Sequence, residues 1–351
     1  MAFLGDHDFE PVDALPCPTV MLATIGKRAA TAVLIVAGCV LVWYAQSRVF
    51  ARQRCVSVVQ TDAPSASEPQ APVRFPAAIR VATFNIAHAR GGEFGASNWT
   101  GASKEQVRSR LAKIARQVAG AGVDVLVLNE VDFDASWSRS IDQAAEIARR
   151  AGFSYVAEQR NIDVTLPLRT FRFGNAILSR YPIANARAVR FPPLSPVEAA
   201  LAGNHDGLVA EVHTPIGRVS VVAVHLEYRS EDVRLQCARI LKTLAEAGAY
   251  PVIAMGDFNS IPGFAGKHPG YVPPPETAVD LLLRSGTLAV SEAPLDWARY
   301  LTFPSARPDR AIDWILTSPG LEQGVPTVIQ SDLSDHLMVA VPIGQRGSGE
   351  P

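Results

Sequence analysis

Residues 251–259 read PVIAMGDFN, a short apolar run that closes with Asp257 and Asn259. An apolar run of four to eight residues, bounded by proline and by polar residues, is typical of a buried strand. A single polar residue at a strand end is usually only the beginning of a turn. The pattern recurs along the chain, however, and the recurrence points to a shared site.

Five further apolar runs carry a polar residue at or beside their end. They are RVATFN ending at Asn85, VDVLVLNE ending at Glu130, RVSVVAVHLE with His225, AIDWIL with Asp313, and LMVAVPI, which follows Asp335 and His336. Neighbouring strand ends meet at one edge of a sheet, and such edges are where α/β proteins form ligand clefts. We therefore expect these side chains to converge.

The residue types in this set suit metal-assisted chemistry. Carboxylates with an asparagine and two histidines, without thiolates, favour a hard divalent cation such as Mg²⁺ or Mn²⁺. Asp313 lies inside an apolar run, where a carboxylate is costly unless it is paired, and a histidine is the obvious partner. Such a pairing would fix the histidine's tautomer and raise its basicity, as a general base requires.

Helical patterns alternate with the apolar runs, so the sequence predicts a mixed α/β domain. The clearest helix begins at Ser103, where Gln106 completes a capping box, and ends near Gly120. Two further helices are expected, one from Ser140 to a stop at Gly152 and one over residues 230–248. We expect all three to be packing elements.

The order of these motifs resembles the endonuclease/exonuclease/phosphatase superfamily, which includes DNase I, exonuclease III, the neutral sphingomyelinases and the inositol-polyphosphate 5-phosphatases. The resemblance covers nearly all of residues 77–345. It rests on the strand-end residues above, GNAILSRYPI at 174–183, GDFN at 256–259 and SDH at 334–336. It implies a four-layer α/β sandwich, in which two mostly antiparallel sheets face each other and helices cover the outside.

The resemblance also implies which residues hold the metal. Glu130 would be the main protein ligand of Mg²⁺ or Mn²⁺, and Asn85 and Asp335 would help directly or through water. Asn175, in the family's substrate-side strand, could reach the substrate, although an asparagine after glycine is more often turn chemistry. His88 and Arg90, after the first of these strands, could line the pocket or form an ordinary polar loop.

Further roles implied by the resemblance concern the attacking water and the phosphate. His336, oriented by Asp313, would be the general base or a phosphate contact. Asp257 would position the nucleophile or serve the leaving group. Asn259 and His225 would donate hydrogen bonds to phosphate oxygens. Having a histidine at 225 makes the site more like DNase I, sphingomyelinases and 5-phosphatases than like abasic-site nucleases, which place a tyrosine in a related role.

Composition narrows the substrate only slightly. The chain has 351 residues, 48% hydrophobic and 19% charged, which excludes wholesale disorder. Five of the 33 Lys and Arg and six of the 34 Asp and Glu precede residue 74, so the remainder carries 28 of each sign. A neutral domain lacks the bulk basic charge typical of nucleic-acid binding. The four cysteines fit neither a disulfide framework nor a cysteine zinc site.

Residues 29–45, AATAVLIVAGCVLVWYA, run 17 residues without a charge and have basic flanks, which predicts a single-pass transmembrane anchor. The domain after it is expected on the non-cytoplasmic side. Two alternatives stay open. Met21 could begin a signal sequence, and Val36 to Cys39 resembles a bacterial lipobox, although the apolar run continues past the cysteine.

The expected organisation is a tail (1–28), an anchor (29–45), a flexible linker rich in Pro, Ala and Ser (46–76), a catalytic domain (77–345) and a second tail (346–351). The expected function is hydrolysis of a phosphoester, namely a phospholipid headgroup, nucleic acid or a small phosphodiester. No protein partner is implied. The alternative is an inactive membrane-tethered module that binds a phosphorylated partner.

Overall fold

The structure is a computed structural model that describes residues 18–45, 56–60, 78–92, 101–166, 169–201, 203–263, 274–290 and 300–346. Residues 1–45 and 46–351 form two separate units. The first contains one helix, α1 (Pro18–Ala45), within which residues Gly26–Trp43 are long and apolar enough to cross a membrane. A signal sequence near the N-terminus would have the same property.

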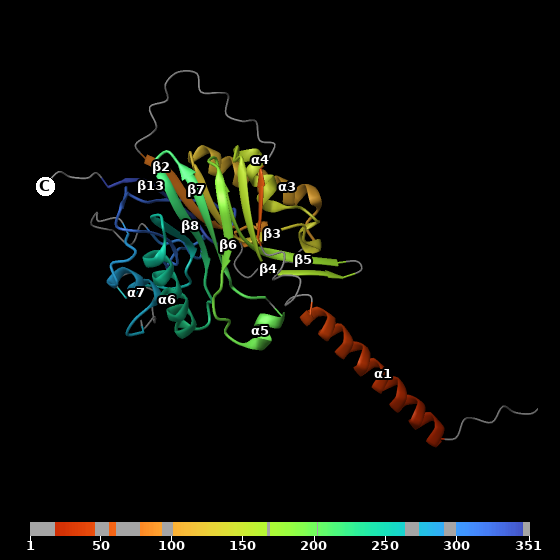
Figure 1. Cartoon of the computed structure of the whole chain (residues 1–351). Helices are drawn as coiled ribbons and strands as arrows, with labels where there is room; N and C mark the ends of the chain where they lie inside the picture. The colour runs from red at the N-terminus through yellow and green to blue at the C-terminus, as the bar shows by residue number, and fades with distance from the viewer. Residues whose placement is uncertain are drawn as a thin grey trace, which may run out of the picture. The chain divides into compact units, whose positions relative to one another are not determined.

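The second unit contains two facing sheets (Figure 1). The first sheet has the order β1-β4-β5-β3-β2-β13-β11, and β12 also pairs with β13. Its strands are β1 (Val56–Gln60), β2 (Ala78–Asn85), β3 (Val125–Asp132), β4 (Tyr155–Leu166), β5 (Arg169–Ser179), β11 (Leu321–Gln323), β12 (Thr327–Ile329) and β13 (Met338–Gln345).

The second sheet has the order β10-β9-β8-β7-β6. Its strands are β6 (Ile183–Val189), β7 (Gly207–Thr214), β8 (Gly217–His225), β9 (Val252–Asp257) and β10 (Asp313–Thr317). In each sheet one pair is parallel, β2 with β3 and β8 with β9, and the other pairs are antiparallel. The expected mostly antiparallel character is confirmed.

Helices cover the outer faces of the sheets (Figure 1). α3 (Lys104–Gly120) and α4 (Gln143–Ala151) share an apolar core with the first sheet, and α6 (Glu231–Ala247) and α7 (Ala278–Arg284) share one with the second. A third core lies between the sheets, where alternate side chains of both sheets face each other. The short helices are α5 (Pro196–Leu201), η2 (Ala87–Ala89) and η3 (Ser136–Ser138). The expected four-layer sandwich is therefore confirmed.

Capping chemistry sets the helix boundaries. Ser103 and Gln106 form the expected capping box of α3, and the Ser230 side chain accepts a hydrogen bond at the start of α6. α4 differs from expectation, because its N-cap is Asp142, whose side chain accepts from the Ala145 N–H. Ser140 lies before the helix in the left-handed region, with φ +52°. The Asp142 cap, two residues after Ser140, therefore sets the start of α4.

The expected linker over residues 46–76 differs from the structure at one place. Residues Val56–Gln60 form β1, which pairs antiparallel with Tyr155–Gln159 of β4. Three valines in five residues give this piece a strong strand preference inside a polar segment. Of the expected N-terminal tail (1–28), residues 18–28 belong to α1. Residues 1–17, the rest of the linker and residues 347–351 lie outside the described residues.

Candidate active site

The parallel strand pairs bring polar residues of both sheets to one place. Asn85 ends β2, while His225 and Asp257 end β8 and β9 as register partners. Asp313 begins β10 opposite Asp257. The amide of Asn85 joins the two sheets, because its Nδ2 lies 3.2 Å from Glu130 Oε1 and 3.2 Å from Asp257 Oδ2. Strand ends expected to converge from sequence therefore do so.

Glu130 occupies an irregular position near the end of β3. The pairing of β3 with β5 shifts register between Leu128 and Val131, and Glu130 adopts φ +52°. A non-glycine residue in this region is strained, which is common where a side chain is aimed into a site. The bulge leaves the Glu130 side chain 25% exposed, whereas its neighbours in the strand are buried. Glu130 is thus an accessible carboxylate near the end of β3.

Positive and polar groups surround the Glu130 carboxylate. Oε2 lies 3.5 Å from His88 Nε2 and 3.5 Å from Arg90 Nη2, and Oε1 lies 3.9 Å from His225 Nε2. Although burial alone would raise it, His88, His225 and His336 lower the pKa of Glu130 to about 2. The group is therefore ionised at neutral pH.

Asp313 and His336 form a buried pair. His336 Nδ1 lies 2.9 Å from Asp313 Oδ2, which also accepts a 2.5 Å hydrogen bond from Thr302 Oγ1. The other oxygen, Oδ1, is buried without a hydrogen-bond partner among the described residues. The partner expected for Asp313 is therefore present. Burial opposes the charged ring, but Asp313, Asp257 and Asp335 raise the pKa of His336 to about 10.

Asp257 lies between the two histidines of the site. Its Oδ2 is 3.7 Å from His336 Nε2 and 3.8 Å from His225 Nε2, and its Oδ1 accepts a 2.8 Å hydrogen bond from the Asn259 N–H. Burial raises the pKa of Asp257 to about 7, and Asp313 adds to the effect against the opposing charge of His336. Burial also lowers the pKa of His225. Asp257 thus has two histidine nitrogens just beyond hydrogen-bond distance.

Asn259 and Asp335 lie at the edges of this group. Asn259 Nδ2 donates to the Leu226 carbonyl at 3.0 Å, so one of its two amide hydrogens is used. Asp335 Oδ1 lies 3.3 Å from Ser334 Oγ, and burial raises the pKa of Asp335. Ser334 Oγ donates its one hydrogen to the Asn85 carbonyl at 2.7 Å. The SDH turn is therefore fastened to the end of β2.

Asn175 has a different role from the substrate contact that the sequence suggested. It is fully buried, its Oδ1 accepts from Asn129 Nδ2 at 2.7 Å, and its Nδ2 donates to Gln159 and to the Asp206 carbonyl. Both ends of its amide are thus used inside the protein. Asn129, which precedes Glu130 in LNE, also binds the main-chain N–H of Asp257 through Oδ1. Sequence reasoning missed Asn129, although a polar residue inside an apolar run was a usable signal.

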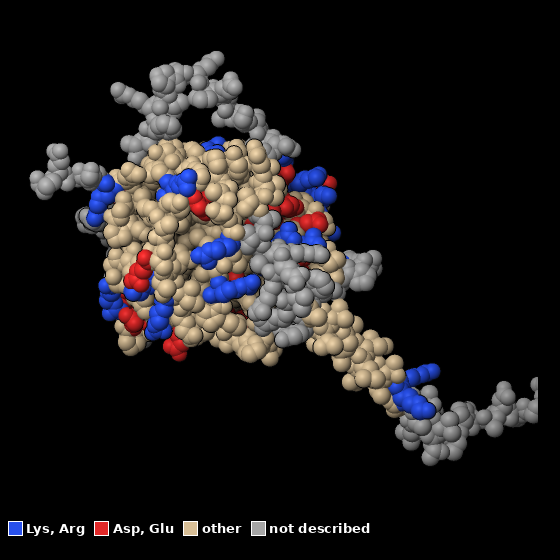
Figure 2. Space-filling view, in the orientation of Figure 1, with Lys and Arg blue, Asp and Glu red and all other residues tan. Residues whose placement is uncertain are grey.

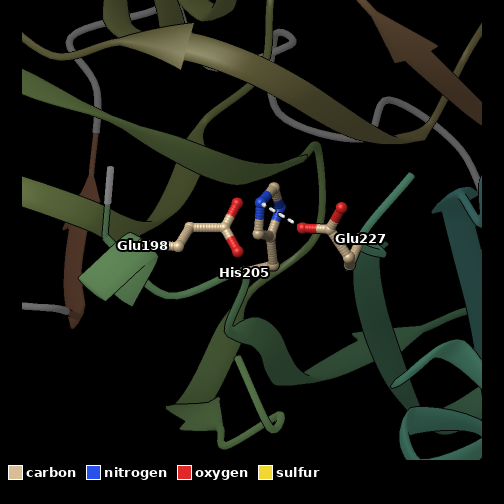
Figure 3. Close-up of side chains that lie close together, drawn as sticks. All are labelled: Glu198, His205 and Glu227. Atoms are coloured by element: carbon tan, nitrogen blue, oxygen red, sulfur yellow. Dashed lines mark ion pairs between the residues drawn. The ribbon is translucent and has the colours of Figure 1, made fainter. Parts of the chain in front are cut away.

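A second polar group lies beside His225. Figure 3 shows the His205 ring between the carboxylates of Glu198 and Glu227. The three ligand atoms are close enough for a cation, but Arg229 pairs with Glu198 and makes bonds of 2.9 and 3.1 Å to Glu227. Because this guanidinium already pairs with both carboxylates, we assign no cation here. The His205 and His225 rings meet edge-on, 5.4 Å apart.

Comparison with known proteins places this fold. A crystal structure of an endonuclease/exonuclease/phosphatase from Beutenbergia cavernae matches with a TM-score of 0.54 and 22% identity, covering 77% of this chain and 72% of that one. A mannosyl-6-phosphatase from Bacteroides thetaiotaomicron matches with a TM-score of 0.54 and 18% identity, covering 76% and 99%. A humanized TDP2 from D. rerio matches with a TM-score of 0.51 and 14% identity, covering 77% of this chain and 100% of that one. These likenesses show the class of fold, a four-layer α/β sandwich.

Sequence comparison identifies the family. Residues 82–336 match the endonuclease/exonuclease/phosphatase family over most of the chain, and the protein belongs to that family. No curated protein matches it. Members of this family are typically phosphoester hydrolases and generally use a divalent metal. Asp257, Asp313 and His336 form one buried group whose ligand atoms lie close enough together to hold an ion.

Proposed function

We propose that this protein is a membrane-anchored, divalent-metal-dependent phosphoester hydrolase. The observation that carries the proposal is the convergence of an ionised glutamate and an Asp313–His336 pair around the Asp257 carboxylate. Phosphoester hydrolysis needs positive charge near the phosphate and a group that positions water in line with the leaving oxygen. Residues from both sheets supply these parts.

The donors around Glu130 suit a hard divalent cation. An ionised carboxylate at the accessible end of β3 offers the oxygen ligands that Mg²⁺ and Mn²⁺ prefer. Glu130 would be the main ligand, with Asn85 and Asp335 assisting directly or through water. When bound, the cation would neutralise charge on the phosphate oxygens. His225 and Arg90 would face the same phosphate.

Asp257 and His336 are placed to handle the attacking water. Asp313 holds Nδ1 of His336, which leaves Nε2 directed toward Asp257 Oδ2 at 3.7 Å. This separation suits two groups that share a water or a substrate oxygen. Asp257 would take one proton from the water as its oxygen bonds to phosphorus and the bond to the leaving oxygen breaks. His336 and His225 would donate to phosphate oxygens, and the leaving oxygen would take a proton from solvent.

The substrate is a phosphoester accessible to a membrane-anchored enzyme. The chain from Arg74 onward carries equal numbers of acidic and basic residues, and the face in Figure 2 shows both signs scattered over a largely uncharged surface. This balance favours a phospholipid headgroup or a small phosphoester over duplex DNA. The α1 helix would hold the enzyme at the membrane, where headgroups are concentrated.

The experiment uses the full chain in detergent, incubated separately with plasmid DNA, sphingomyelin, a soluble phosphodiester and a sugar monophosphate. Each reaction is run with Mg²⁺, Mn²⁺ or EDTA. We expect turnover of at least one substrate that EDTA abolishes and that Asp257→Ala lowers at least a hundredfold. Asp232→Ala, an exposed aspartate on α6, is the matched control and should leave turnover unchanged.

Two results would contradict the proposal. One is an absence of turnover on the whole panel with either metal, combined with binding of a phosphorylated ligand that Glu130→Ala leaves unaffected. That result would favour an inactive binding module. The other is turnover that survives both EDTA and Asp257→Ala, which would place the chemistry elsewhere.

A further inference from the structure

A third histidine of the site, His88, contacts Glu130 and is not used by the proposed mechanism. His88 lies in η2, the turn after β2, and its side chain is only 10% exposed. Its Nδ1 is 2.7 Å from Asp132 Oδ1, and its Nε2 is 3.5 Å from Glu130 Oε2. The ring therefore spans a fully buried carboxylate and the accessible one.

The surroundings of His88 fix the direction of its ring. Asp132 accepts a second hydrogen bond, of 2.7 Å, from Trp137 Nε1. Gln143, at the start of α4, donates to the His88 carbonyl at 2.9 Å and accepts from the Asp132 N–H at 3.1 Å. Trp137 and Phe173 pack edge-on against the imidazole. Residues of β3, η3, α4 and β5 therefore hold the turn and its histidine.

The backbone of this turn is strained. Ala87, His88 and Ala89 have φ values of +46°, +54° and +56°, in the left-handed region that is unfavourable for non-glycine residues. Such strain persists only where the surrounding contacts enforce it, and it is concentrated at functional sites. Here the contacts direct Nε2 of His88 toward the Glu130 carboxylate.

We propose that His88 Nε2 is a nitrogen ligand of the divalent cation held by Glu130, a proposal that rests on the metal dependence of the proposed function. A carboxylate oxygen accepts hydrogen bonds, so the His88 nitrogen that faces Asp132 carries the hydrogen. The other nitrogen is then the one that faces Glu130. Histidines that bind metals typically donate their second N–H to a carboxylate in this way, which orients the ring.

The proposal changes the metal preference expected for the site. An imidazole nitrogen beside carboxylate and amide oxygens suits Mn²⁺, Co²⁺ or Zn²⁺ better than Mg²⁺, which prefers oxygen ligands alone. Arg90 Nη2 lies 3.5 Å from the same oxygen of Glu130. We expect this guanidinium to move away from Glu130 when the cation binds, because like charges repel at this distance.

The test is pulsed electron paramagnetic resonance of Mn²⁺ bound to the full chain in detergent. The wild type should show ¹⁴N modulation from a coordinated imidazole, and ¹⁵N-histidine labelling should replace it with ¹⁵N modulation. His88→Gln, whose amide can still bond Asp132, should abolish the nitrogen signal. His225→Gln and His336→Gln should retain it. If His88→Gln does not fold, retention of the nitrogen signal in these two variants still shows that neither His225 nor His336 is its source.

Affinity supplies a second readout. His88→Gln and Asp132→Asn should each weaken Mn²⁺ binding about tenfold, the lower end of the effect expected for these positions, and should change Mg²⁺ binding less. His213→Gln, a half-exposed histidine on β7, is the matched control. The proposal is overturned if wild-type Mn²⁺ shows no histidine nitrogen, if it binds no Mn²⁺, or if His225→Gln or His336→Gln removes the signal. Nitrogen-coordinated Mn²⁺ without turnover would instead contradict only the proposed function.

Discussion

Asp313 holds His336 from a position with no solvent access. Its side chain is 0% exposed, and His336 and Thr302 share its Oδ2. Asp313→Asn keeps the shape of the side chain but can place an N–H against the nitrogen of His336 that should donate. We expect kcat to fall at least a hundredfold with little change in KM, because ring orientation is lost while the substrate contacts remain.

Thr302→Val is the matched control for this prediction. It removes the other hydrogen bond to Asp313 and leaves the histidine pair intact, so kcat should fall less than tenfold. Steady-state kinetics on the best substrate would be compared, with circular dichroism to confirm folding. Equal losses in the two variants would mean that packing, and not histidine orientation, is what Asp313 provides.

Glu158, on β4, makes stability depend on pH. Burial raises the pKa of Glu158 to about 7, and the nearby Asp142 adds to the effect. Between the ordinary value near 4.5 and 7, the folded chain binds more protons than the unfolded chain. The free energy of unfolding contributed by Glu158 is therefore fully present below pH 4.5 and is lost as the pH rises through 7. The loss should be on the order of 2 kcal/mol.

Denaturant titrations at pH 5 and pH 8 would measure this dependence of the free energy of unfolding on pH. Glu158→Gln should reduce it, because an amide does not titrate. Glu146→Gln should not reduce it, since the pKa of Glu146 on the surface of α4 is shifted down by Arg150 and Arg149 against the effect of burial. If the unfolding free energy of Glu158→Gln changed as much between pH 5 and pH 8 as that of the wild type, the Glu158 carboxylate would not be the cause of the pH dependence.

Sequence predicts site residues best where they terminate strands. His225 and Asp257 end neighbouring strands of one sheet, so their approach follows from sheet geometry, whereas Asn85 meets Asp257 from the other sheet. Asn129 is recognisable as a polar residue inside an apolar run, but its contact with Asp257 joins strands of different sheets, so the sequence does not indicate its partner. His88 was visible only as a polar loop residue, because its partner Asp132 lies 44 residues away.

At the scale of elements, Gly256 controls how closely β8 and β9 approach. It adopts φ +147°, and a Cβ at this position would lie 1.8 Å from the Val224 carbonyl oxygen. Gly256→Ala must therefore separate the parallel pair that places His225 beside Asp257. We expect a loss of at least about 3 kcal/mol in unfolding free energy, as overpacking and backbone strain combine.

Gly286→Ala is the comparison for the Gly256→Ala prediction. That glycine has φ +67° after α7, and no atom lies within 4 Å of a Cβ built there. Its substitution should cost only the left-handed strain of about 1 kcal/mol. Denaturant unfolding of both variants would separate the two effects. Similar losses would show that strain alone, and not the contact with Val224, explains the glycine at 256.

Helix ends illustrate what local sequence can decide. The capping box at Ser103 and the cap at Ser230 both follow from hydrogen bonds within one turn, and the structure has both. The start of α4 was expected at Ser140 but lies at Asp142, because two neighbouring residues could each cap it. β1 was missed because a five-residue strand acquires its order from pairing with β4, a contact almost 100 residues away.

At the scale of the whole molecule, the question is whether α1 anchors the chain. The Gly26–Trp43 window has the length and composition of a membrane span, and a cleaved signal sequence would pass the same test. We predict that the helix is retained. An N-terminal tag should remain on the same polypeptide as the hydrolase domain, and the chain should stay in the membrane fraction after alkaline carbonate extraction.

Substitutions inside α1 would show whether the helix itself or a lipid attached to Cys39 keeps the chain in the membrane. Val36→Arg with Leu41→Arg should release the chain into the soluble fraction, because each charge at mid-helix costs about 2.5–3.5 kcal/mol of insertion free energy. Cys39→Ser should leave the chain in the membrane, since the apolar run continues beyond residue 39. Loss of the tag would identify a signal sequence. Release by Cys39→Ser would instead identify a lipid anchor, and the helix would then serve export and not retention.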